Sequence, residues 1–311
     1  MRILIYGAGV VGCELAHELC KTKHEITLLA RGDWKKNLDG HGLIIRHYAQ
    51  LRTTVDRIKT IEVLAPEDRY DCIFVVMQFE QIKKVLPVLS ANQSRYLVLV
   101  GNNMEPEYCL QELRRHATAE KEIAFGFQAT GGRREDGKVI SVHLKPSMTV
   151  GGLRGHLSTA FEKLLNHAVE GSRYQLNFER HMEGWLICHL AFILPIAYVC
   201  YAVDCNLHYA TREQIALIFD ATAQAHVMLK KQGIPIRPDG EEEYFTLGRK
   251  KNEKLLYLMA KTPFGKLAAS DHCEHAVDEM KALDAAFEAI ITASGEPMEM
   301  WEKLRKTGKH F

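Results

Sequence analysis

The feature that most constrains this chain is a glycine-rich turn that directly follows its first apolar run. Ile3 to Tyr6 has the composition of a short buried strand, and an amphipathic segment from Cys13 to Cys20 has that of a helix. The turn between them contains Gly7, Gly9 and Gly12. In strand-to-helix turns with this spacing, the first glycine allows a tight bend, the second lets the backbone approach a pyrophosphate, and the third lets the helix pack close to the strand. The helix N-terminus adds unpaired N–H groups. We therefore expect a dinucleotide to bind at Gly7, Ala8, Gly9, Val10, Val11 and Gly12.

The residue after the second predicted strand indicates which dinucleotide binds. Domains specific for NAD usually have a carboxylate there, which accepts from the ribose hydroxyl groups. This chain has Ala30-Arg31-Gly32 instead. A guanidinium group can clamp a 2′-phosphate, so Arg31 predicts a preference for NADP(H), whereas Asp33 two residues later favours NAD(H). The alternative is that Arg31 is only a solvated loop residue.

Length and charge limit the class of protein. A chain of 311 residues exceeds the usual size of one hydrophobic core, so two domains are expected. Apolar residues make up 47% and charged residues 25%, which is ordinary for a globular protein. The net charge is +1, from 40 Lys and Arg against 39 Asp and Glu, and it indicates neither nucleic acid nor an anionic membrane as a partner.

The first half alternates short apolar runs with amphipathic segments, the pattern of parallel strands joined by helices. We expect an α/β protein with a doubly wound, Rossmann-type NADP-binding domain over 1–165 and an all-helical domain for substrate and dimerisation over 166–311. Three segments are expected to form a hairpin-like extension of the sheet, because they are rich in strand formers and are separated by Gly131, Gly132 and an Asp136-Gly137 turn. They are Glu122 to Ala129, Lys138 to His143 and Met148 to Val150. Predicted strands are 2–6, 25–30, 72–76, 96–100, 122–129, 138–143 and 148–150. Predicted helices are 157–170, 178–203, 211–232, 240–259, 273–293 and a short one after Pro297.

The eight cysteines form no Cys-x-x-Cys pair, and no histidine spacing is typical of zinc. His272 and His275 lack further ligands at convincing spacing, so no metal site is predicted. A reduced, cytoplasmic setting is the simplest interpretation. The apolar stretch from Trp185 to Val203 approaches the length of a membrane span, but it contains His189 and Pro195 and is better explained as a buried core helix.

Several segments together resemble the ketopantoate reductase (2-dehydropantoate 2-reductase) family. They are the glycine turn, Leu28 to Gly32, the loop Gly101-Asn102-Asn103-Met104 and the segment Gly132 to Val139, followed by a helical second half. The resemblance spans nearly the whole chain. It implies an NADPH-dependent reduction of a 2-oxo acid to a 2-hydroxy acid in a cleft between the two domains.

The resemblance also implies site residues. Asn102 matches the asparagine of the family's Asn-Gly loop, although Asn103 stands where the family has glycine. Glu279 matches the family's late glutamate, and Ser270 lies near its substrate-binding serine. Gln78 stands just after a strand where many members have lysine. We thus expect Asn102 and Glu279 to be catalytic and to bind cofactor together with Gln78, and we expect Asn103 and Ser270 to bind substrate.

One departure from the family concerns its catalytic lysine. That lysine would fall among Trp185, Leu186 and Ile187, and no lysine occurs between Lys163 and Lys230. Reduction of a ketone needs a proton donor near the carbonyl oxygen. His189 is the most attractive replacement, because imidazole titrates near neutral pH. The alternative is a core histidine with one satisfied hydrogen bond.

Three functions remain open at this point. The leading hypothesis is an NADPH-dependent reductase of a small 2-oxo acid or related carbonyl compound, acting as a homodimer. The second is a non-catalytic NADP(H)-binding or sensing protein that has lost the chemistry with the lysine. The third is a dehydrogenase that joins amino acids to oxo acids and uses a histidine.

Overall fold

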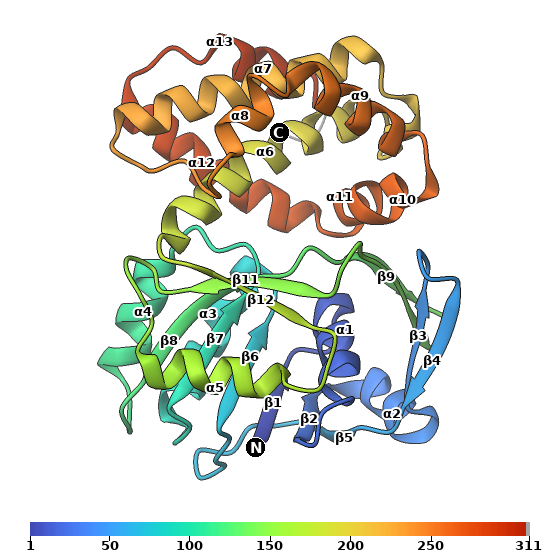
Figure 1. Ribbon diagram of the computed structural model, residues 1–311, viewed down its shortest axis with the longest axis vertical. Coiled ribbons are helices and arrows are strands. Elements are labelled where there is room, and N and C mark those ends of the chain that lie inside the picture. Colours follow the sequence, from blue (N-terminus) through green and yellow to red (C-terminus); the bar gives the residue numbers. More distant parts are fainter. Residues whose placement is uncertain (309–311) are drawn as a thin grey trace. The chain divides into compact units, whose positions relative to one another are not determined.

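The computed structural model describes residues 1–308, and the chain divides into two compact units, Met1–Met182 and Glu183–Phe311. The first unit is built on strands and the second on helices (Figure 1). The predicted α/β fold class, with a Rossmann-type unit followed by an all-helical one, is confirmed.

An eight-stranded sheet forms the core of the first unit. Its strand order is β12-β11-β8-β7-β6-β1-β2-β5. All neighbours are parallel except β8 and β11, which are antiparallel. The central strands are apolar throughout, as expected for a sheet that is covered on both faces. The strands are β1 (Arg2–Tyr6), β2 (Glu25–Leu29), β5 (Lys59–Ile61), β6 (Cys72–Val76), β7 (Tyr96–Val100), β8 (Glu122–Phe127), β11 (Ser147–Gly151) and β12 (Gln175–Glu179).

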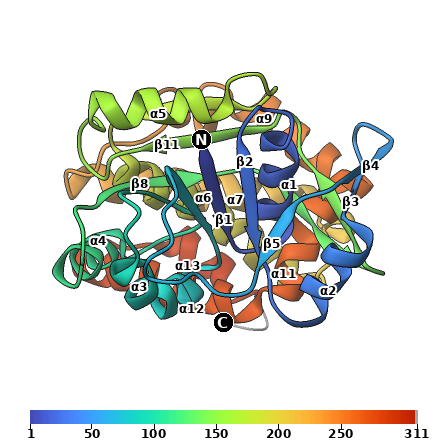
Figure 2. The ribbon, with the colours of Figure 1, turned by 90° about the horizontal axis from the view of Figure 1, so that it is seen from below.

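Five helices pack around this sheet. In Figure 2, α3 and α4 lie together at one side, and α5 lies beside β11. Helix α5 buries one apolar face, on which Phe161, Leu165 and Ala168 recur at helical spacing. The helices are α1 (Val10–Leu19), α2 (Gly32–His41), α3 (Phe79–Ala91), α4 (Pro106–Arg115) and α5 (Thr159–Val169).

A second, four-stranded sheet lies on the other side of α1 from β1 (Figure 1). It has the order β4-β3-β10-β9, with β3 (Leu43–His47), β4 (Arg52–Asp56), β9 (Gly131–Glu135) and β10 (Lys138–Val142). The hairpin predicted around Asp136-Gly137 exists as β9 and β10. The predicted extension of the main sheet is confirmed for Glu122 to Ala129 and Met148 to Val150, which form β8 and β11 there. It is wrong for Lys138 to His143, because β10 pairs with β3 instead. Strands β3, β4 and β5 were not predicted.

The boundary between the units lies later than the predicted 165/166. Strand β12 pairs in parallel with β11 at the edge of the main sheet, from Ser147 opposite Gln175 to Gly151 opposite Glu179. The connecting helix α5 therefore belongs to the first unit, where sequence periodicity alone had marked the start of a helical region. Because β12 is short and half exposed, its pattern differs little from that of a loop.

All regular elements among the described residues of the second unit are helices. The predicted helix 240–259 is interrupted at Thr246 to Gly248 and becomes two. Trp301 stacks on Phe287 with ring centroids 4.6 Å apart and anchors the C-terminal helix in the core. The longer helices are α6 (Met182–Ala202), α7 (Arg212–Lys231), α9 (Arg249–Ala260) and α12 (Val277–Ser294), and the shorter are α8 (Glu241–Phe245), α10 (Pro263–Gly265), α11 (Asp271–His275) and α13 (Glu299–Arg305).

Helix α6 contains the apolar stretch noted in the sequence. It is the one helix of residues 1–308 that is long and apolar enough to cross a membrane, and 67% of its most apolar window is buried within the protein. A core helix of a large helical unit has the same length and composition.

Candidate functional site

The glycine turn has the backbone that its sequence predicts. Gly7 has φ +126°, and a Cβ there would overlap the carbonyl oxygen of Val76 on the neighbouring strand β6. A Cβ on Gly12 would overlap the carbonyl oxygen of Gly7, so a larger residue would push α1 off the turn. Space opens only at Gly9, where a Cβ would meet no atom within 4 Å. This arrangement leaves room for a ligand beside Gly9, at the start of α1.

The turn lies where the order of the strands reverses. From β1 the chain goes to β2 on one side and later to β6 on the other, and ligands of doubly wound sheets bind at such a switch point. The loop after β7 reaches the same edge, because a Cβ on Gly101 would come within 2.6 Å of the carbonyl oxygen of Met77. The glycine turn and the Gly101-Asn102 loop therefore share one edge of the sheet.

Arg31 lies next to the glycine turn. It precedes the first residue of α2, and its guanidinium group donates a hydrogen bond of 3.1 Å to the hydroxyl of Tyr6, the residue before Gly7. The carboxylate of Asp33, which favours NAD in the sequence, instead pairs with Lys36 at 2.8 Å in an exposed contact. A cation is thus held beside the turn while the nearby acid is paired on the surface.

Trp34 and Arg134 also contact this region, and sequence reasoning did not select them as site residues. The indole Nε1 of Trp34 donates to the carbonyl oxygen of Ala8 at 2.9 Å. The guanidinium group of Arg134, on β9, lies over the Trp34 ring at 5.2 Å from its centroid. Arg134 is within the segment that carried the family resemblance, but its place near the turn depends on the second sheet. It supplies a second positive charge near the turn.

Asn102 and Asn103 differ in what their side chains contact. Asn102 is 7% exposed, and within residues 1–308 no hydrogen-bond partner exists for its Oδ1. Asn103 has its Oδ1 engaged by the backbone N–H of Glu105 at 3.0 Å and its Nδ2 by the sulfur of Cys109 at 3.5 Å. A buried amide oxygen without a partner is costly and indicates a missing ligand group. Asn102 therefore suits ligand binding, whereas Asn103 shapes the loop.

Gln78 directly precedes α3, at the carboxyl end of β6. Its Oε1 accepts a 3.1 Å hydrogen bond from Nε2 of Gln81, one turn into that helix. This position is on the edge that holds the glycine turn, because β6 runs parallel beside β1. The predicted cofactor contact of Gln78 stays a prediction.

In the helical unit, His189 lies in the middle of α6 and stacks on Trp185, with ring centroids 5.2 Å apart. Burial, with a smaller contribution from the nearby His272, lowers the pKa of His189 to about 4. His189 is therefore an uncharged imidazole near neutral pH. It can polarise a carbonyl group through an N–H, but it does not titrate near neutral pH as expected from its sequence.

His272 lies beside Glu279. Its Nε2 lies 3.6 Å from Oε2 of Glu279, whose side chain is 5% exposed, while that of His272 is 42% exposed. Glu279, predicted to be catalytic, thus has a histidine neighbour that was considered only as a metal ligand from the sequence. The charge of the same histidine also contributes to the lowered pKa of His189.

Ser270 is 1% exposed, and its Oγ accepts a hydrogen bond of 3.2 Å from the backbone N–H of Leu207. This contact fixes the short helix Leu207–Tyr209 and supports a structural role. The prediction that Ser270 binds substrate gains nothing from it.

The comparisons with known proteins identify the first half of the chain. Residues 3–155 match the family described as ketopantoate reductase PanE/ApbA, so the resemblance seen in the sequence is confirmed. These residues contain the glycine turn, Arg31, Gln78 and Asn102. No curated protein sequence matches the chain.

Solved structures extend the likeness to the whole fold. A PanE/ApbA family ketopantoate reductase from Ralstonia eutropha JMP134 has 14% identity and a TM-score of 0.73, covering 98% of this chain and 96% of that one. D-mandelate dehydrogenase, solved with NADH and anilino(oxo)acetate, has 14% identity and a TM-score of 0.70, with coverage of 99% and 96%. A ketopantoate reductase from Staphylococcus aureus, described as dimeric, has 11% identity and a TM-score of 0.64, with coverage of 98% and 96%.

Proposed function

We propose that this protein is an NADPH-dependent reductase that converts a small 2-oxo acid to the 2-hydroxy acid without the lysine that its family would place on α6. The observation that carries the proposal is the shared sheet edge, where the open space at Gly9, the cation of Arg31 and the unpartnered Oδ1 of Asn102 lie together. A dinucleotide with a 2′-phosphate suits these three groups.

The residues of the first unit would bind and orient the cofactor. Backbone N–H groups from Gly9 onward, at the start of α1, suit the pyrophosphate. Arg31 suits the 2′-phosphate, and Arg134 adds positive charge nearby. Asn102 can accept from an amide or hydroxyl group of the ligand. When bound, NADPH supplies the hydride for the carbonyl carbon.

The residues of the second unit would handle the proton and the substrate carbonyl group. His189, with its pKa lowered to about 4, can donate a hydrogen bond to the carbonyl oxygen but holds no extra proton at neutral pH. The proton that completes the hydroxyl group therefore has to come from elsewhere. His272 is exposed enough to exchange protons with water and lies beside Glu279, so this pair is the proton source in the proposal.

The alternative function is a non-catalytic NADP(H)-binding or sensing protein. It is favoured by one observation, that α6 carries no lysine and its histidine is uncharged near neutral pH. Both functions use the same nucleotide site, so nucleotide binding alone does not separate them.

An assay of NADPH oxidation over a panel of 2-oxo acids, with and without amino acids as co-substrates, tests the proposal. Turnover of at least one 2-oxo acid alone, lost in His272→Ala, supports the reductase and its proton source. Turnover that requires an amino acid as co-substrate would contradict the reductase and indicate a dehydrogenase that joins amino acids to oxo acids. Tight NADPH binding without turnover of any compound would favour the sensing protein.

We further propose that the protein is a homodimer and that it acts in the cytoplasm. Support for the dimer comes from the S. aureus ketopantoate reductase, which is described as dimeric. Measurement of the mass in solution by light scattering tests it, and a monomer at micromolar concentration would refute it.

A further inference from the structure

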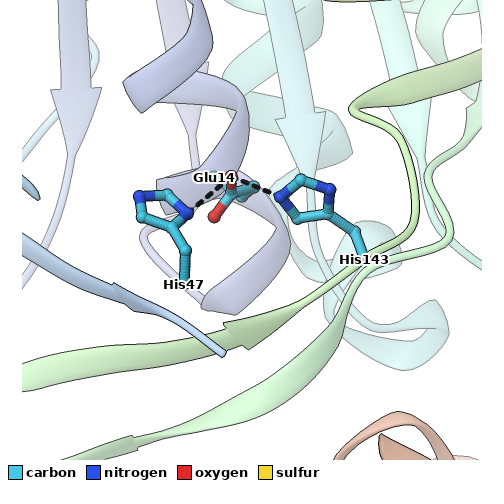
Figure 3. Close-up of side chains that lie close together, drawn as sticks. All are labelled: Glu14, His47 and His143. Atoms are coloured by element: carbon cyan, nitrogen blue, oxygen red, sulfur yellow. Dashed lines mark hydrogen bonds and ion pairs between the residues drawn. The ribbon is translucent and has the colours of Figure 1, made fainter. Parts of the chain in front are cut away.

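A buried cluster of two histidines and a glutamate lies between α1 and the four-stranded sheet, and the proposed reaction does not use it. Glu14 is on α1, His47 on β3 and His143 directly after β10. Their exposed fractions are 0%, 1% and 5%. Figure 3 shows the carboxylate of Glu14 between the two imidazole rings.

The distances in the cluster suit a metal ion. Oε1 of Glu14 lies 3.0 Å from Nε2 of His143 and 3.4 Å from Nδ1 of His47, and the three atoms all lie within 4.8 Å of one another. Two ligands bound tetrahedrally to zinc, at its usual bond lengths to nitrogen and oxygen, are about 3.3 Å apart. The carboxylate and imidazole atoms thus have nearly the spacing that one ion would impose.

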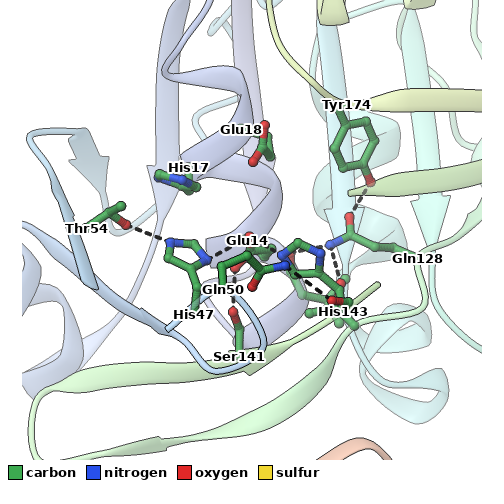
Figure 4. A network of polar contacts seen from close by, with 12 residues as sticks. Glu14, His17, Glu18, His47, Gln50, Thr54, Gln128, Ser141, His143 and Tyr174 are labelled. Atoms are coloured by element: carbon green, nitrogen blue, oxygen red, sulfur yellow. Dashed lines mark hydrogen bonds and ion pairs between the residues drawn. The ribbon is translucent and has the colours of Figure 1, made fainter. Parts of the chain in front are cut away.

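The neighbours of the cluster orient these atoms. The hydroxyl of Ser141 donates to Oε2 of Glu14 at 2.7 Å, which leaves Oε1 for the two rings. Nε2 of His47 shares a 2.8 Å hydrogen bond with Oγ1 of Thr54. Such outer contacts are typical of histidine and carboxylate ligands, because they fix the tautomer and the ring orientation (Figure 4).

The contact of His47 with the carboxylate does not have the geometry of a hydrogen bond. Its Nδ1 faces Oε1 of Glu14 at 3.4 Å, and no hydrogen-bond partner for this Nδ1 exists within residues 1–308. A cation between the imidazole nitrogen and the carboxylate oxygen would satisfy both buried atoms.

A further carboxylate lies close to the cluster. His17 stacks against His47 at 4.7 Å, and its Nδ1 lies 2.6 Å from the carboxylate of Asp56, which adds a second negative charge.

We propose that Glu14, His47 and His143 bind a divalent transition-metal ion, with Zn²⁺ best suited to two imidazoles and one carboxylate, and that the ion ties α1 to the four-stranded sheet. No metal-binding motif could be recognised in the sequence, because the three ligands are far apart in the chain and come together only in the fold. The proposal is independent of the reductase activity.

Metal analysis of the purified protein tests the proposal. After incubation with Zn²⁺ and desalting, the full chain should hold about one ion, and Glu14→Gln or His143→Ala should hold almost none. Glu18→Gln is the matched control: Glu18 is one turn further along α1, is 2% exposed and pairs with Lys21 at 2.6 Å. It should keep the ion.

Two further measurements cover variants that fail to fold. Co²⁺ bound to the unaltered protein should give the absorption bands of tetrahedral cobalt, which Zn²⁺ removes. Ser141→Ala keeps all three ligands and should weaken Zn²⁺ binding by roughly 10- to 100-fold. No uptake of Zn²⁺ or Co²⁺ by the unaltered protein, or equal uptake by Glu14→Gln and Glu18→Gln, would overturn the proposal and leave a proton-sharing cluster.

Discussion

The two units differ in how well they match the site residues that the family resemblance implies. In the first unit the glycine turn, Arg31 and Asn102 lie along one edge of the sheet, as the proposed nucleotide site requires. In the second unit α6 lacks the lysine that the family resemblance implies, and its histidine is held uncharged. The proposal therefore keeps the nucleotide site that the resemblance implies, but it assigns the proton transfer to other residues.

The glycine turn gives the sharpest test of the first unit. In Gly7→Ala the new Cβ would overlap Val76 at a backbone φ of +126°, so we expect both folding and NADPH binding to fail. Gly9→Ala is the matched change, because its Cβ meets no protein atom within 4 Å. It should melt like the unaltered protein yet bind NADPH at least 10-fold more weakly, since only the ligand is crowded. Calorimetry and thermal melting separate the two, and normal binding by Gly7→Ala would contradict the account.

His189 is the corresponding test in the second unit. A group positioned at the carbonyl oxygen typically contributes about 10²-fold or more to the rate, so His189→Ala should lower kcat by about that factor. Because the pKa of His189 is about 4, activity should show no titration of this residue between pH 6 and 8. Unchanged turnover in His189→Ala would show that His189 only packs within the helical unit and takes no part in the reaction. An activity step near pH 6.5 that disappears in this variant would show that His189 is charged in the working enzyme.

His226 lies on α7 in the second unit and should make the stability of that unit depend on pH. It is 2% exposed, and burial lowers its pKa to about 4 from 6.5. Between pH 6.5 and about 4, His226 is therefore protonated in the unfolded chain but not in the folded one. The free energy of unfolding should fall as pH decreases through this window, by on the order of 2–3 kcal/mol from this residue. Urea unfolding of His226→Leu at pH 7 and pH 4.5 should show a smaller loss on acidification, and an equal loss would refute the assignment.

Arg31 tests the preference for NADP(H). A charge-assisted hydrogen bond on a partly exposed surface is worth about 10-fold in affinity, so Arg31→Ala should weaken NADPH binding by about that factor and leave NADH unchanged. Calorimetric titration of both cofactors gives the ratio. If the substitution leaves the ratio of NADPH to NADH affinity unchanged, Arg31 does not recognise the 2′-phosphate. Arg134 would then be the remaining candidate for that contact.

The smallest effect is expected at Asp33. Its contact with Lys36 joins two side chains that are 96% and 80% exposed, and such surface pairs contribute little. Asp33→Asn should therefore leave stability and the ratio of NADPH to NADH affinity unchanged within about 2-fold. A shift toward NADPH beyond that range would show that the carboxylate opposes the 2′-phosphate.

Local sequence patterns predicted most elements but not how they join. The strands expected at the centre of the main sheet all exist, because central parallel strands are continuous apolar runs such as Cys72–Val76. Strand β4 was missed because its exposed residues, Arg52 to Asp56, lack both periodicity and apolar content. The hairpin β9–β10 was found, but its partner β3 is about 90 residues away, and no local signal encodes such a pairing.

The same limit applies to the site. Gly7 and Gly12 were predictable, since their spacing has a backbone reason that acts within one βα unit. Arg134 over Trp34, His272 beside Glu279 and the Glu14 cluster all join residues distant in sequence. The pKa of His189 could not be anticipated either, because it depends on burial within the helical unit.

A crystal structure of the protein with NADPH and a 2-oxo acid tests the central claim most directly. The account predicts the pyrophosphate at Gly9, the 2′-phosphate within hydrogen-bond distance of Arg31 and a nicotinamide contact to Oδ1 of Asn102, with His189 within reach of the substrate carbonyl oxygen. A nucleotide bound at the turn with His189 and Glu279 both remote from the nicotinamide would contradict the claim that these two residues take the place of the absent lysine.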